Sequence, residues 1–150
     1  MEWSRSNSII LSRVCIGLFA AAGIVCAVGA PFAISGIVSR RGMEIQIGSV
    51  YFMASFYSLL LPAFAALICL YTLLSNISKG EIFIAGNIKC LRWISWACYL
   101  AAGISCLSVF YYRPFIILAA GAGFMGLILR VVKNVFAEAV YMKQEQDYTI

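Results

Sequence analysis

The chain contains no histidine, and only six of its 150 residues are acidic. Histidine is the commonest general base and the commonest metal ligand in enzymes, so a Ser-His-Asp or Cys-His catalytic site is excluded. None of the acidic residues falls within a long apolar run, so the membrane carboxylate on which small proton-coupled multidrug exporters depend is also missing. We therefore expect a protein that is not an enzyme, with no catalytic residues, no cofactor-binding residues and no metal site.

Charged residues of both signs make up only 11% of the chain, whereas soluble proteins contain about 25%. Hydrophobic residues make up 63%, and a soluble domain of this length would lack the polar residues needed to cover them. A lipid bilayer around the chain removes that difficulty. The composition thus predicts an integral membrane protein.

The basic residues give a net charge of +5, which would indicate a nucleic-acid partner if they formed a stripe on a soluble face. They lie instead at the ends of apolar runs, where phospholipid headgroups are found. We expect the lipid bilayer as a partner, and no nucleic acid. The residues at these run ends are Arg40, Arg41, Lys79, Lys89, Arg92, Arg113, Arg130 and Lys133.

The six cysteines do not form a CxxC motif, and most of them lie inside apolar runs. A thiol oxidoreductase of the membrane needs paired cysteines near the surface. We interpret these cysteines as small packing residues.

Four apolar runs are long enough to cross a membrane, since a helix needs about 20 residues to span roughly 30 Å of hydrocarbon. The predicted fold is all-α: one integral membrane domain, residues 1–150, folded as a four-helix bundle. Its approximate spans are 14–38, 50–74, 93–111 and 115–133, followed by a cytoplasmic tail, 134–150.

The first run could be a cleaved signal peptide. Its hydrophobic region is much longer than the 7–15 residues expected of one, and Pro31 directly after Gly29-Ala30 is a poor cleavage context. We treat it as a retained helix.

The segment between the second and third spans contains the turn formers Ser75, Asn76 and Gly80, so the second helix should end there. Helical spacing resumes at about Asn87. We expect a short interfacial loop here. At the other end of the chain, the helical pattern of the fourth span continues past Arg130, which predicts a cytoplasmic extension of that helix.

Basic residues are distributed unevenly between the two sides of a four-span protein. Only Arg40, Arg41 and Arg113 fall on one side, and eight basic residues fall on the other. The positive-inside rule then places both termini in the cytoplasm, an N-in/C-in topology. The eight are Arg5, Arg13, Lys79, Lys89, Arg92, Arg130, Lys133 and Lys143.

Small residues recur one turn apart in the fourth span, as Ala119 with Gly123 and Ala122 with Gly126. Such steps let two helix backbones approach closely. They indicate packing within the bundle, with a dimer interface as the alternative.

Two segments resemble a bacterial family of uncharacterised four-helix membrane proteins, the YoaS-like domain of unknown function. The first is Lys79-Gly80-Glu81-Ile82-Phe83 with Asn87-Ile88 and Leu91-Arg92-Trp93-Ile94, and the second runs from Phe136-Ala137-Glu138 to Thr149-Ile150. The sequence departs from the family pattern at Ile82, where a proline is usual, and at Gln144 and Gln146. The resemblance implies a bacterial protein with four spans and no established activity.

Both segments fall on the predicted cytoplasmic side, where they could form one partner-docking surface; the alternative is that they fix the loop and cap the helices. The candidate docking residues are Lys79, Gly80, Phe83, Asn87, Leu91, Arg92, Glu138, Lys143, Glu145, Asp147 and Thr149.

We therefore expect a multi-pass protein of the bacterial cytoplasmic (inner) membrane that acts as a non-enzymatic accessory or regulatory subunit, related to membrane stress or peptide immunity. Its partner would be a membrane protein, a cytoplasmic protein or a second copy of the chain. The alternative is a small oligomeric channel or transporter, in which Pro62, Ser55, Tyr57 and Ser58 could line a path. An intramembrane enzyme is the least favoured function.

Overall fold

The computed structural model describes the backbone of residues 2–41 and 44–149, with side chains for residues 7–33, 35 and 49–149. Helices make up almost all of this part of the chain, and it contains no strand. They are α1 (Glu2–Arg41), α2 (Glu44–Ser78), α3 (Ala85–Ser108) and α4 (Phe115–Tyr148). Each contains a segment long and apolar enough to cross a membrane. The predicted all-α four-helix membrane fold is confirmed.

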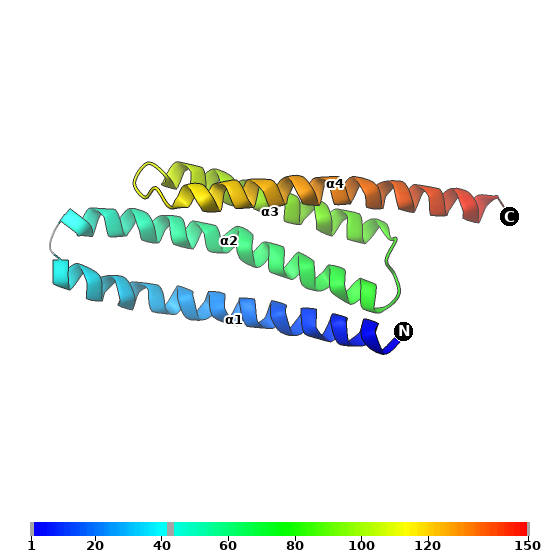
Figure 1. Cartoon of the computed structure of the whole chain (residues 1–150), viewed down its shortest axis with the longest axis horizontal. Helices are drawn as coiled ribbons and strands as arrows, with labels where there is room; N and C mark the ends of the chain where they lie inside the picture. The colour runs from blue at the N-terminus through cyan, green and yellow to red at the C-terminus, as the bar shows by residue number, and fades with distance from the viewer. Residues whose placement is uncertain (1, 42–43, 150) are drawn as a thin grey trace.

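The helices run alternately in opposite directions, and each packs against the next one in the chain (Figure 1). Over the described ranges, the backbone of α1 closely approaches only that of α2, so α1 forms one edge of an open bundle. The α2–α3 loop, residues 79–84, lies at the same end of the bundle as the C-terminus, opposite the α3–α4 connection (Figure 1). We call this the loop end.

Two helices extend beyond the spans expected from hydropathy. Helix α3 begins at Ala85, two residues before the position where helical spacing was expected to resume, and its first turns carry the polar residues Asn87, Lys89 and Arg92, which lie before the expected apolar span. Helix α4 has 34 residues, or about 51 Å at 1.5 Å per residue, so it is longer than the roughly 30 Å of hydrocarbon. The predicted extension of the fourth helix is thus present.

Few large side chains are buried. Leu91, Ile94 and Phe115 form the buried apolar core, while most other large hydrophobic side chains face outward. In a soluble protein this exposure would promote aggregation, but lipid covers such side chains in a membrane. The outward-facing surface is therefore the one expected of a membrane bundle.

Glycines allow α3 and α4 to pack closely. A Cβ on Gly126 would lie 3.1 Å from the ring of Tyr99, and one on Gly123 would lie 3.9 Å from the Ala102 methyl. The Ser95 hydroxyl also donates a hydrogen bond of 2.9 Å to the carbonyl of Gly126. The small residues of α4 thus pack within the bundle, as predicted.

Candidate functional site

The loop end is built on a tight turn that stops α2 at Ser78. Gly80 has a φ of +83°, a conformation that side chains with a Cβ rarely adopt. Its amide donates to the carbonyl of Ile77 at 3.1 Å, and the amide of Glu81 donates to that of Asn76 at 3.1 Å. These bonds satisfy carbonyls that have no partner within the helix, so they fix the backbone conformation where the loop begins.

Asn87, in the first turn of α3, forms hydrogen bonds to the loop. Its side-chain amide donates to the carbonyls of Glu81 at 2.9 Å and Ile82 at 2.7 Å, and its Oδ1 accepts a bond of 2.8 Å from Asn76. The Asn87 side chain is fully buried. A buried amide that uses both of its polar atoms in this way fixes the conformation of its neighbours.

Phe83 connects the loop to α4. Its ring centroid lies 5.9 Å from that of Phe136, with the two planes tilted by 43°. Phe83 nevertheless leaves 43% of its side chain exposed. The contact places the loop beside this part of α4, whereas Glu138, two residues after Phe136, lies on roughly the opposite side of the helix.

Beyond this contact α4 projects past the loop (Figure 1). Every residue from 141 to 149 is exposed, including Lys143, Glu145 and Asp147. The hydroxyl of Thr149 donates to the carbonyl of Glu145 at 2.5 Å, which closes the end of the helix. Lys143 lies about 10 Å farther along the helix axis than Phe136.

The eleven predicted docking residues therefore fall into three groups. Lys79, Gly80 and Phe83 are exposed in the loop, and Glu138, Lys143, Glu145, Asp147 and Thr149 are exposed on α4. Asn87 and Leu91 are buried and stabilise the loop and the α3 core. Arg92 is exposed but lines a pocket between α3 and α4. The docking role of the set stays a prediction.

That pocket was not predicted from the sequence. It has a volume of about 250 Å³ and is lined by Arg92, Ser95, Trp96, Tyr99, Arg130 and Lys133. In the sequence, Arg92, Arg130 and Lys133 are seen only as basic residues at the ends of separate apolar runs. Their convergence depends on the register of α3 against α4, which is set by the contact of Tyr99 with Gly126.

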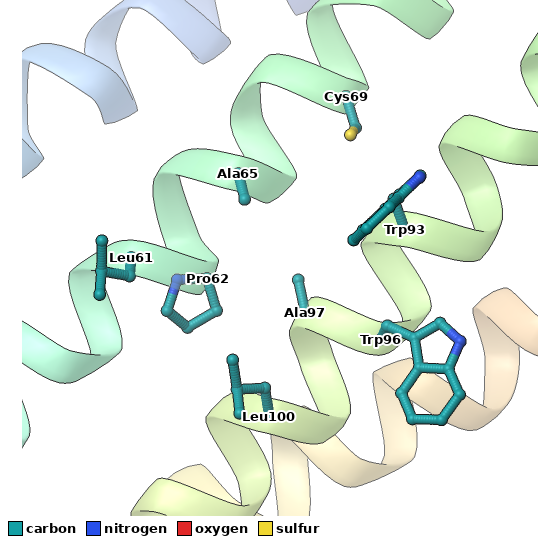
Figure 2. A pocket seen from close by; sticks show the side chains of 8 residues that line it. All are labelled: Leu61, Pro62, Ala65, Cys69, Trp93, Trp96, Ala97 and Leu100. Carbon is teal, nitrogen blue, oxygen red and sulfur yellow. The ribbon is translucent and has the colours of Figure 1, made fainter.

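An apolar groove of about 450 Å³ lies between α2 and α3. Figure 2 shows Pro62 and Ala65 of α2 across the groove from Ala97 and Leu100 of α3. Trp96 lines both this groove and the cationic pocket, so the two hollows adjoin.

Two of the hydroxyls proposed to line a channel, those of Ser55 and Tyr57, form hydrogen bonds to other parts of the bundle. Ser55 accepts a hydrogen bond of 2.8 Å from Ser108 and also bonds to Tyr111, which joins α2 to the far end of α3. The Tyr57 hydroxyl donates to the carbonyl of Ala27 at 2.7 Å, which joins α2 to α1. These groups link helices to each other.

The model of a family described as a protein of unknown function (DUF2975) matches residues 24–150. No curated protein and no solved structure matches the chain.

Proposed function

The chain belongs to the DUF2975 family of proteins of unknown function, and we propose that it is a non-enzymatic accessory or regulatory protein of the bacterial inner membrane. In this proposal a partner protein docks at the loop end, on the cytoplasmic side. The positive-inside distribution of Lys and Arg supports that orientation. The missing histidine and the apolar spans without carboxylates support a role without catalysis or cofactor.

The projection of α4 is the observation that carries the proposal. The helix continues about 18 Å beyond Phe136 to Tyr148, and its last residues, from 141 on, are exposed. Charges of both signs, on Lys143, Glu145 and Asp147, lie on this segment. A helix that leaves the bundle and carries mixed charge offers a partner both area and charge complementarity, which set specificity and orientation.

Phe83 supplies an apolar anchor beside that helix. Its contact with Phe136 restricts the ring, while nearly half of the side chain remains exposed. Aromatic side chains held in this way contribute strongly to protein interfaces, because little conformational freedom is lost on binding. Lys79 lies four residues before Phe83 in the same loop and adds a positive charge at its edge.

Two finer parts of the proposal rest on the sequence alone. The first is membership of the YoaS-like group, which is supported by the Lys79–Phe83 segment and the terminal Thr149-Ile150. The second is a role in membrane stress or in immunity to a membrane-active peptide. Growth of a deletion strain under envelope stress and under such a peptide, compared with its complemented parent, tests that role directly.

A channel or transporter is the weaker function. Ser55 and Tyr57 already form hydrogen bonds between helices, so they are not free to replace the hydration shell of a passing solute. Flux through liposomes containing the protein should therefore equal that of empty vesicles. A solute flux above that level would favour the channel.

Crosslinking in native membranes, followed by purification, tests the docking proposal. We expect a stoichiometric partner that is lost when Phe83→Ala or Lys79→Ala is introduced. Phe110→Ala is the matched control, because Phe110 is 92% exposed but lies near the opposite end of α3. Recovery of a second copy of the chain would identify a homo-oligomer as the partner. A protein that purifies without any partner, or a partner unaffected by Phe83→Ala, would contradict the proposal.

A further inference from the structure

The pocket between α3 and α4 brings together three cations. Arg92 comes from α3, and Arg130 and Lys133 come from α4. No acidic residue lines the pocket, and among the described side chains none of these cations forms an ion pair. Three like charges around a hollow of about 250 Å³ repel each other unless an anion lies between them.

The walls of the pocket are held in a definite register. The Tyr99 ring packs against Gly126, and the Ser95 hydroxyl bonds to the carbonyl of the same glycine. The Trp96 ring centroid lies 6.4 Å from that of Tyr99, in an edge-to-face arrangement. These contacts keep α3 and α4 at a constant separation below the cations, so the three charges are presented together.

The apolar groove between α2 and α3 adjoins the cationic pocket. Trp96 is shared between the cationic pocket and the groove between α2 and α3. On α3 the groove extends from Trp93 to Leu100, or about 10 Å along the helix axis. From Trp93 to Leu100 the groove runs away from the loop end and toward the middle of α3 (Figure 2).

We propose that the cationic pocket binds the phosphate of an anionic phospholipid and that one acyl chain of this lipid lies in the groove. Arg and Lys are the side chains that bind phosphate, and basic pockets between membrane helices recognise lipid headgroups. Trp96 and Tyr99 are the aromatic types found at the level of the headgroups. This inference does not depend on the proposed protein partner.

Two simpler occupants explain less of the structure. A single exposed arginine near a helix end can extend toward the headgroups on its own, but that does not account for three cations from two helices around one hollow. A free phosphate would satisfy the cations, but it would leave the adjoining groove unused. An anionic lipid fills both, so the lipid is the occupant we infer.

Quenching of Trp96 fluorescence by brominated lipid tests the inference. In a background with Trp3→Phe and Trp93→Phe, Trp96 is the single tryptophan of the full chain. The protein is placed in phosphatidylcholine vesicles that contain a small fraction of either brominated phosphatidylglycerol or brominated phosphatidylcholine. We expect the anionic lipid to be preferred by at least about fivefold, the effect of one basic residue near an anionic surface.

Variants assign the preference to the pocket. Arg92→Gln combined with Arg130→Gln should abolish it, whereas Arg130→Lys should keep most of it, because the charge is retained. Lys89→Gln is the matched control, since Lys89 is an exposed cation on the same helix outside the pocket. Circular dichroism and size-exclusion chromatography report whether each variant is folded, and Arg92→Gln alone replaces the double variant should the latter unfold.

Three results would overturn the inference. Equal quenching by the two lipids would show that no anionic lipid is selected. A preference that survives the loss of both arginines would place the binding elsewhere. A change in Trp96 fluorescence with inorganic phosphate in detergent, without any lipid preference in vesicles, would assign the pocket to a free anion.

Discussion

The side-chain amide of Asn76 donates a hydrogen bond of 2.8 Å to Oδ1 of Asn87, across the loop that joins α2 to α3. Asn87 in turn donates to the carbonyls of Glu81 and Ile82. One fully buried residue therefore connects the last turn of α2, the loop and the first turn of α3. The loop end depends on this connection, because Lys79 and Phe83 lie within the segment that it holds.

Replacing Asn87 by alanine should destabilise the loop end. The change removes three part-buried hydrogen bonds, and a typical intramolecular hydrogen bond contributes about 0.5–1.5 kcal/mol. We expect the free energy of unfolding in mixed micelles to fall by about 2 kcal/mol. Protease cleavage within residues 79–84 should accelerate in parallel.

Lys89→Ala is the control for this change, because Lys89 lies on the same helix but is exposed. It should leave both the unfolding free energy and the cleavage rate unchanged. An Asn87→Ala protein as stable and as protease-resistant as the parent would show that the three hydrogen bonds do not hold the loop.

Gly80→Ala should strain the turn that ends α2. At a φ of +83° an added Cβ costs about 1–2 kcal/mol, although nothing else lies within 4 Å of it. Gly86→Ala serves as the comparison, since Gly86 is helical and its added Cβ would meet only the flexible side chain of Ile84 at 3.5 Å. Thermal unfolding monitored by circular dichroism should show a lower midpoint for Gly80→Ala alone. Equal midpoints for the two variants would argue against strain at this turn.

Gly126→Ala should separate α3 from α4. The new methyl would lie 3.1 Å from the Tyr99 ring, and overpacking of this kind costs about 1–3 kcal/mol. Gly121, on the same helix, has nothing within 4 Å of an added Cβ, so Gly121→Ala should be neutral or slightly stabilising. Unfolding by increasing amounts of denaturing detergent measures both. The prediction is wrong if the two variants unfold at the same detergent fraction.

The fold could be predicted from the sequence because a long apolar run has few stable structures available in a membrane other than a spanning helix. Small residues also identified where α4 packs closely, and Gly123 and Gly126 do face α3. Helical spacing from about Asn87 predicted the start of α3 at Ala85 to within two residues, whereas hydropathy alone marks only the apolar part of the helix and misses its polar first part. Asn87 and Arg92 belong to that polar first part of α3.

The site was less predictable, since it depends on contacts between distant parts of the chain. The sequence drew attention to Asn87, but its burial follows from the position of Asn76 across the loop. Likewise Arg92 and Arg130 are each visible as isolated cations, and only the register of α3 against α4 makes them neighbours. Pairings of this kind are tertiary and leave no periodic signal in one sequence.

The central claim is that the loop end and the projecting part of α4 lie on the cytoplasmic side of a four-span protein. Single cysteines at Lys79, Lys143 and Arg113, in a chain whose six native cysteines are replaced, test it with a membrane-impermeant maleimide. In intact cells whose outer membrane has been permeabilised, the maleimide should label Arg113→Cys. It should label Lys79→Cys and Lys143→Cys only after the cells are lysed. Labelling of Lys79→Cys or Lys143→Cys in the intact cells, with Arg113→Cys protected, would contradict the account.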